Sequence, residues 1–325
     1  MSQAAPEKES VHSSHEIDLM ALNEIRIGLQ ASPKSISPKY FYDEYGSQLF
    51  DQITRLPEYY PTRTEVAILT RYADEIAKIA GRGKVLLEPG AGSCSKVRHL
   101  LRALNPACYV PTDISRDYLF AAAEKLQQEF MDIPVYPAAG DMQSEVTLPP
   151  EMEGIQRLVF YPGSTIGNYT PEHAAEFLRH IRNVIGDDGG LLIGVDLQKD
   201  SAILNKAYND AAGITAQFNL NTLTHINALT GSDFDLRQFH HIAFYNDQAG
   251  RIEMHLESQT DQLVTLPDAH ISLAQGERIL TEYSYKYSLE GFSELAAEAG
   301  LTLQQYWTDD ENLFSLQYYA AQKRC

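Results

Sequence analysis

The chain has few cysteines and no long hydrophobic run. Its 325 residues include Cys94, Cys108 and Cys325, which are too few and too scattered for a disulfide framework or a CxxC-type metal site. No stretch approaches the roughly 18 apolar residues that cross a bilayer. Residues 1–15 are polar, without the apolar segment of a signal peptide, and we interpret them as a disordered tail. These absences favour a reducing, cytoplasmic location.

Positive charge is also scarce. The chain carries 26 Lys and Arg residues against 44 Asp and Glu residues, a formal net charge of -18. A surface of this sign repels nucleic-acid phosphates and anionic lipid headgroups. The histidines, including His240, His241 and His255, lack metal-ligand spacing, so we expect no metal. The charge therefore favours a small-molecule partner over nucleic acid or a membrane, and we expect a monomer.

Strand and helix patterns alternate through the middle of the chain. Short apolar runs occupy residues 85–87, 109–111, 135–138, 158–161 and 191–195. Helical patterns begin between them at Ser95, Arg116 and Pro171. Such alternation is typical of βαβ units on a parallel sheet. The sequence therefore predicts an α/β fold with a Rossmann-like core over residues 80–200.

The flanking segments predict a second, smaller α+β domain for substrate binding. Residues 16–79 form its N-terminal helical part, where Thr62 and Glu65 offer a capping box for a helix that ends before Gly81. Residues 201–288 are an inserted part, with helical segments over 201–229 and strands near 251–257 and 278–287. Residues 289–325 supply a helix and two strands that return to the main sheet.

The candidate cofactor loop follows the first strand of the core. Glu88 ends that strand, and Gly90 and Gly92 then allow a tight turn and a close backbone approach to a ligand. A nicotinamide dinucleotide is disfavoured, because a carboxylate would face its pyrophosphate and Ser95 replaces the third glycine. An acid there suits a cationic ligand. S-adenosyl-L-methionine, with an amino group and a sulfonium, is such a ligand.

Further acids end the next two strands. Asp113 follows the glycines by about 20 residues and is placed to accept hydrogen bonds from a ribose diol. Asp141 can accept the adenine amino group, and Met142 can pack on the ring. Lys96 is a candidate partner for the cofactor carboxylate, with a surface lysine as the alternative. We interpret Cys94 as a small loop residue.

The fourth strand ends in the loop 160–168, which lacks the Asn/Asp-Pro-Pro-aromatic tetrad of many nucleic-acid and glutamine N-methyltransferases. A small acceptor is therefore favoured, and Asn168 can hold an amine or a carboxylate. Methyl transfer to nitrogen needs a closed site with little water. Tyr42, Tyr59 and Tyr208 lie in segments assigned to the smaller domain, where aromatic faces can stabilise cations. Core packing is the alternative for each tyrosine.

One strand pattern offers a polar grip for an acceptor. In the stretch 281–287 the residues alternate, so Glu282 and Ser284 project from one face. A carboxylate and a hydroxyl about 7 Å apart could hold two nitrogens of a small polar ring. A solvated outer face is the alternative.

Several stretches together resemble the histidine N-alpha-methyltransferases of ergothioneine biosynthesis. They are residues 37–43, 56–65, 163–168, 215–219 and 252–254, and the similarity runs from about residue 30 to the end. The resemblance implies a class I methyltransferase core that trimethylates the α-amine of L-histidine to hercynine. Pro89 and Ala91 depart from the Leu and Ser expected of the family, and Cys94 is unusual there.

The resemblance also implies roles for matching residues. Tyr59, Asn168 and Tyr208 would surround the amino-acid head group, Met254 would contact the ring, and Glu282 with Ser284 would bind the imidazole. We take Asn168, Tyr42 and Tyr59 as catalytic candidates and add Gly163 to the substrate site.

Two alternatives remain open. The first is an N-methyltransferase for another amino acid or biogenic amine. The second is a catalytically silent ligand-binding homologue.

Overall fold

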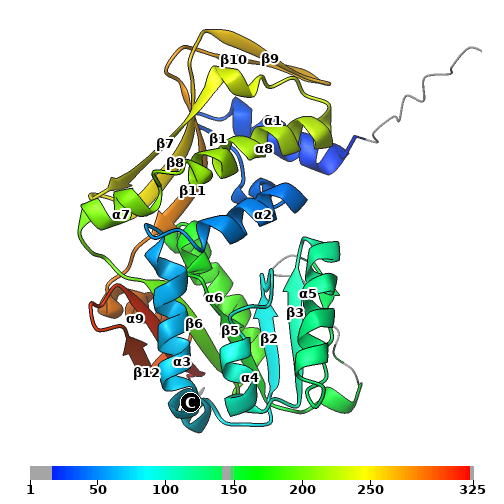
Figure 1. The fold of residues 1–325 in the computed structure, drawn as a ribbon, viewed down its shortest axis with the longest axis vertical. Coiled ribbons are helices and arrows are strands. Elements are labelled where there is room, and N and C mark those ends of the chain that lie inside the picture. The colour runs from blue at the N-terminus through cyan, green and yellow to red at the C-terminus, as the bar shows by residue number, and fades with distance from the viewer. Residues whose placement is uncertain (1–16, 141–147, 149, 323–325) are drawn as a thin grey trace, which may run out of the picture.

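The computed structural model describes residues 17–140, 148 and 150–322. Its lower part in Figure 1 is a seven-stranded sheet with strand order β12-β13-β6-β5-β2-β3-β4. Five strands pair in parallel: β2 (Val85–Pro89), β3 (Cys108–Asp113), β4 (Ala138–Ala139), β5 (Arg157–Tyr161) and β6 (Gly190–Asp196). The antiparallel strands are β12 (Leu301–Thr308) and β13 (Phe314–Ala321). This is the predicted Rossmann-like α/β core.

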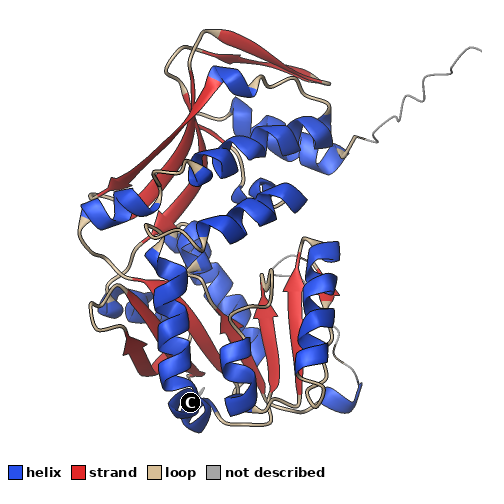
Figure 2. Cartoon of the chain, in the orientation of Figure 1, coloured by secondary structure: helices blue, strands red, loops and turns tan. Residues whose placement is uncertain are grey.

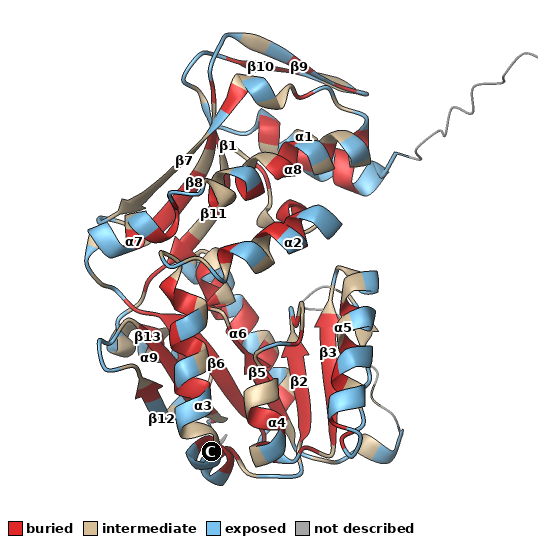
Figure 3. Ribbon diagram, in the orientation of Figure 1, coloured by how far each residue is buried: buried red, intermediate tan, exposed pale blue. Residues whose placement is uncertain are grey.

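Helices cover both faces of this sheet because its strands are apolar on both sides, as the buried strands in Figure 3 show. Leu86 and Leu158 pack with α3 (Tyr60–Ala80), α4 (Arg98–Leu104) and α5 (Arg116–Glu129). Val85 and Leu87 face the other way, toward α6 (Pro171–Ile185) and α9 (Leu289–Glu298). The strand order reverses between β2 and β5, so ligands are expected at the carboxyl ends of these two strands.

The upper part of Figure 2 is a smaller α+β unit. Its sheet has the order β1-β11-β8-β7, made of β1 (Lys34–Ser35), β11 (Arg278–Tyr285), β8 (Arg251–Ser258) and β7 (Phe239–Asn246). A separate hairpin joins β9 (Gln262–Leu266) to β10 (Ala269–Leu273). The helices are α1 (Leu19–Gln30), α2 (Glu44–Ile53), α7 (Ser201–Ala207) and α8 (Ile214–Thr230). Both parts of the chain also contain single 3-10 turns: η1 (Pro38–Phe41) and η4 (Leu236–Gln238) in the smaller unit, and η2 (Pro150–Met152) and η3 (Thr165–Asn168) in the larger one.

Three local expectations are corrected. The helix expected from Thr62 begins at Tyr60, and the capping box is wrong because Glu65 is buried and its carboxylate bonds elsewhere. The helix expected from Ser95 begins at Arg98. The sequence patterns also missed α2, β7 and the β9–β10 hairpin. Within the described ranges, no helix is long and apolar enough to cross a membrane.

A buried carboxylate joins the two parts of the molecule. Asp196 ends β6 and is fully buried, and both of its oxygens accept from the Tyr60 hydroxyl of α3 at 2.8 Å. Lys199 Nζ lies 2.6 Å from Oδ1, and Lys286 Nζ, from the residue that follows β11, lies 2.8 Å from Oδ2. Burial alone would raise the pKa of Asp196, but the two ammonium groups hold it below its usual range.

Asp196→Asn is expected to lower the free energy of unfolding by about 3–5 kcal/mol, because it leaves two buried ammonium groups without a counter-charge. Urea unfolding followed by circular dichroism measures the loss. Asp310→Asn is the control, since the Arg71–Asp310 ion pair is exposed and such pairs contribute little. A loss for Asp196→Asn no larger than that of the control would contradict the role of the pair.

Candidate active site

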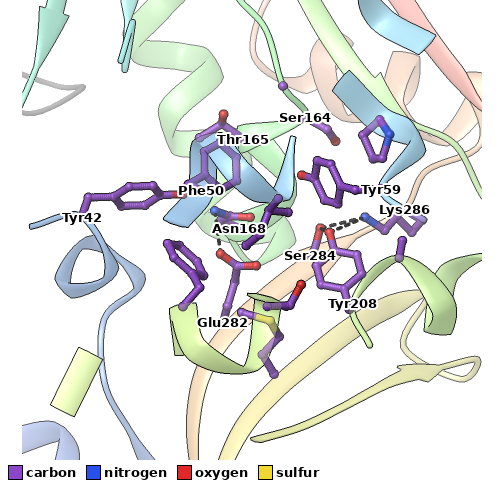
Figure 4. Close-up of a pocket in the computed structure, with 17 residues that line it drawn as sticks. Tyr42, Phe50, Tyr59, Ser164, Thr165, Asn168, Tyr208, Glu282, Ser284 and Lys286 are labelled. Atoms are coloured by element: carbon purple, nitrogen blue, oxygen red, sulfur yellow. Dashed lines mark hydrogen bonds between the residues drawn. The ribbon is translucent and has the colours of Figure 1, made fainter. Parts of the chain in front are cut away.

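A pocket of about 630 Å³, partly open to solvent, lies between the two parts of the fold. Its walls come from α2, the start of α3, the β5–α6 loop, the end of α7, and strands β8 and β11. The structure brings together there all eight residues that the sequence assigned to the acceptor side: Tyr42, Tyr59, Gly163, Asn168, Tyr208, Met254, Glu282 and Ser284. Figure 4 shows the side chains of Tyr42, Tyr59, Asn168, Tyr208, Glu282 and Ser284 converging from both parts of the chain.

Glu282 is the acidic group of this pocket. Its side chain lies on the same face of β11 as Ser284, and its neighbour on β8 is Met254. Asn168 Nδ2 donates to Glu282 Oε2 at 3.4 Å (Figure 4). Burial raises the pKa of Glu282 to about 7, against the opposing effect of the Lys286 cation. The carboxyl group is therefore poised to accept a hydrogen bond from a ligand near neutral pH.

Ser284, on the same strand face, belongs to a polar cluster with Tyr208 and Lys286. Its Oγ lies 2.9 Å from the Tyr208 hydroxyl and 2.7 Å from Lys286 Nζ. Sequence reasoning missed Lys286, although strand alternation places it on the face that carries Glu282 and Ser284. The residue is buried and lines the pocket.

Aromatic rings close the rest of the wall. Tyr59 contacts Tyr208 and Phe50 edge-on, at ring-centroid distances of 6.3 and 6.4 Å, and Tyr42 contacts Phe218 at 5.7 Å. Burial raises the pKa of Tyr42, Tyr59 and Tyr208 well above the usual value. These phenols are therefore neutral at physiological pH and act as hydrogen-bond donors and apolar walls, not as bases.

The predicted cofactor residues gather at the carboxyl ends of β2 and β3. Glu88 is buried, accepts from the Tyr109 hydroxyl at 2.5 Å, and has its pKa raised by burial to about 8. Gly90 and Gly92 have φ values of 68° and 51°, which favour glycine. Asp113 accepts from the backbone N–H groups of Gly92 and Ser115, each at 2.9 Å.

The cofactor loop leaves room for a ligand. Among the described residues, no atom lies within 4 Å of the position that a Cβ on Gly92 would take. Each Asp113 oxygen keeps a further lone pair for a ribose hydroxyl. Cys94 is fully buried with φ 51°, and burial raises its thiol pKa to about 12, so it is no nucleophile. Asp141 and Met142 lie outside the described residues.

Glu65 connects the two halves of the site, and sequence reasoning missed it. Its buried carboxylate lies 2.6 Å from Lys96 Nζ and accepts from the Gly163 N–H at 3.0 Å with both oxygens. Gly194 makes room, because a Cβ there would lie 2.1 Å from Glu65 Oε1. A signal existed in the sequence, since Glu65 precedes Ile68 and Leu69 on the buried face of α3.

The described part of the chain contains no group of three His, Cys, Asp or Glu side chains that could hold a metal ion. Two groups of residues thus lie at the carboxyl ends of the strands: carboxylates at β2 and β3, and the polar and aromatic pocket beside β11.

Comparison with known proteins identifies the family of the chain. The model of the family described as histidine-specific, S-adenosylmethionine-dependent methyltransferases matches residues 21–321. Histidine N-alpha-methyltransferase of Mycolicibacterium smegmatis is 43% identical over 299 residues, covering 90% of this chain and 92% of that protein.

Two fungal relatives are more distant. Ergothioneine biosynthesis protein 1 of Neurospora crassa is 33% identical over 85% of this chain but only 32% of its own length. 4-Dimethylallyltryptophan N-methyltransferase of Epichloe festucae var. lolii is 28% identical, over 87% of this chain and 90% of that protein.

Glu65→Gln is expected to destabilise the fold by about 3 kcal/mol, because the neutral amide leaves Lys96 unpaired and turns an NH2 group toward another donor. The same change should weaken S-adenosylmethionine binding about tenfold, since Lys96 and the Gly163 loop lose their shared anchor. Urea unfolding and calorimetric titration measure the two effects. Glu75→Gln, at an exposed position of the same helix, is the control. Unchanged stability in Glu65→Gln would refute the anchoring role.

Proposed function

The chain belongs to the S-adenosylmethionine-dependent, histidine-specific methyltransferases, and from this premise we propose that it methylates the α-amino group of L-histidine. Three successive transfers would give the trimethylated betaine hercynine, as the first step of ergothioneine biosynthesis. The name of the Mycolicibacterium smegmatis relative supports the acceptor, and that of the Neurospora crassa relative supports the pathway.

The observation that carries the proposal is that Glu282 and Ser284 lie on one strand face inside the pocket. Imidazole has two ring nitrogens, one of which donates a hydrogen bond while the other accepts one. A buried carboxylate and a buried hydroxyl on one strand face are complementary to that pattern. The ring would lie between Met254 and this polar wall, with the amino-acid head group toward Asn168, Tyr59 and Tyr208.

The cofactor contacts are assigned to the other side of the site. Glu88 and Asp113 lie at the carboxyl ends of β2 and β3, and Gly90, Gly92 and Lys96 lie on the loop after β2. Strand β2 is the neighbour of β5, which leads into the loop of Gly163 and Asn168. When bound, S-adenosylmethionine supplies an electrophilic methyl group on its sulfonium. A cationic cofactor beside Glu88 would favour its ionised form against the effect of burial, and this carboxylate with the faces of Tyr42 and Tyr59 would stabilise positive charge on either side of the transfer.

The residues of the chain contribute orientation and exclusion of water. A nucleophilic amine must be unprotonated and aligned with the methyl group. Asn168 can fix the head group through its amide, and the neutral hydroxyl of Tyr59 can donate to the histidine carboxylate. The aromatic wall of Tyr42, Phe50 and Phe218 keeps water from the reacting atoms.

A tryptophan derivative is the second candidate acceptor, because the Epichloe festucae relative carries the name of such an enzyme. The indole ring has a single N–H and no ring acceptor. It would leave either Glu282 or the Ser284 cluster unpaired, which costs about 1–3 kcal/mol for a buried polar group. The pocket therefore favours histidine.

Mass spectrometry of histidine incubated with the protein and S-adenosylmethionine tests the function. We expect masses that correspond to one, two and three added methyl groups, with the trimethylated species accumulating. Methylation of a tryptophan derivative or another amine in place of histidine would overturn the acceptor assignment. Cofactor binding without any methylated product would indicate a silent homologue.

Two alanine variants should separate the two halves of the site. Glu282→Ala removes the carboxylate that accepts a hydrogen bond from the ring N–H. It is expected to weaken histidine binding about 100-fold, because a lost charge-assisted hydrogen bond costs roughly 3 kcal/mol. S-adenosylhomocysteine binding should change less than twofold. Asp113→Ala should show the reverse pattern. Isothermal titration of both ligands against both variants measures the four constants, and equal losses of both ligands in either variant would contradict the assignment.

A further inference from the structure

Lys286 is a buried cation at the wall of the pocket, and its hydrogen bonds are saturated. Its side chain is 1% exposed. Its Nζ contacts Ser284 Oγ at 2.7 Å, Asp196 Oδ2 at 2.8 Å and the Tyr208 hydroxyl at 3.2 Å (Figure 4 shows the Ser284 contact). An ammonium has three donors and no acceptor. The three contacts use all of its protons, so Ser284 and Tyr208 must each accept one of them.

This arrangement decides what the two hydroxyls can offer a ligand. They carry two protons between them, and one proton is used in the 2.9 Å hydrogen bond from one hydroxyl to the other. Neither hydroxyl can donate to Lys286. One O–H therefore remains for the pocket whichever hydroxyl donates to the other. The wall at Ser284 and Tyr208 is a hydrogen-bond donor, and Glu282 on the same strand face is an acceptor when ionised.

A neutral imidazole matches one donor and one acceptor, whereas an imidazolium carries two N–H donors. The second donor of an imidazolium would meet an O–H group that is backed by an ammonium.

We propose that Lys286 is a positioning residue that makes the pocket select the neutral imidazole of histidine, in the tautomer whose N–H faces Glu282 and whose bare nitrogen faces the Ser284–Tyr208 pair. The inference rests on the proposed function, since it concerns histidine as the acceptor. It adds a specificity determinant that acts through two hydroxyls without contacting the reacting amine.

Nitrogen NMR of ring-labelled histidine, bound to the full chain with S-adenosylhomocysteine, tests the proposal at pH 6. Free histidine is mostly imidazolium at this pH, because its ring pKa is about 6.5. We expect the bound ring to show one protonated and one unprotonated nitrogen. Histidine affinity should fall at least about fourfold from pH 8 to pH 6, because roughly three quarters of the free ring is protonated at pH 6. Protonation of Glu282, whose pKa burial raises to about 7, weakens binding over the same range. Two protonated nitrogens in the bound ring would overturn the inference and leave the proposed function intact. A lack of any bound histidine would overturn both.

Variants assign the effect to Lys286. Lys286→Met frees both hydroxyls to accept, so we expect the bound ring to become imidazolium at pH 6 and the fourfold loss of affinity to shrink. Lys199→Met is the matched control, because Lys199 also bonds Asp196 but not Ser284 or Tyr208; the ring should stay neutral. Lys286→Gln, whose amide oxygen can accept from either hydroxyl, is the second variant if the methionine does not fold. A neutral bound ring in a folded Lys286 variant would refute the role of this residue.

Discussion

The pairing of the buried Asp196 carboxylate is the interaction on which the site depends. A charge at the end of a fully buried strand is tolerated only when it is paired and hydrogen-bonded. Three side chains from different segments meet that requirement at Asp196. They are Tyr60 of α3, Lys199 before α7, and Lys286, which follows β11. The need to neutralise one carboxylate therefore fixes the smaller sheet against the carboxyl end of β6 in the larger one.

A second buried carboxylate lies on the same helix, α3. Glu65 lies five residues after Tyr60 on α3, and it bonds the loops that follow β2 and β5 through Lys96 and Gly163. Those loops flank the reversal of strand order, where a cofactor on one side can meet an acceptor on the other. Helix α3 thus links both ligand subsites, and Tyr59 at its start turns into the pocket.

The sequence predicted the parts of this architecture that depend on local periodicity. Apolar runs marked the parallel strands, acids at strand ends marked Glu88 and Asp113, and alternation placed Glu282 beside Ser284. Long-range ion pairs have no local signal, so the partnership of Asp196 with Lys286, 90 residues later, could not be inferred. The misassigned capping box has the same cause: Thr62 and Glu65 have the right spacing, but a distant lysine and a distant backbone N–H bind the Glu65 carboxylate. The strand β7 was missed because its residues are mostly half-buried and lack a clear alternation.

Acceptor choice within this fold follows from the cost of leaving buried polar groups unpaired. Apolar contacts such as that of Met254 distinguish rings only weakly, because one methylene in a pocket is worth about 1–3 kcal/mol. A site built to exchange hydrogen bonds with a ring rejects a ring that lacks them far more strongly. Glu282 and the Ser284–Tyr208 pair form such a site, and Lys286 decides that one half of it donates. An indole, with one N–H and no ring acceptor, would leave one half of this pair of groups without a partner. The polarity that Lys286 sets at Ser284 and Tyr208 therefore weighs against an indole more than pocket size does.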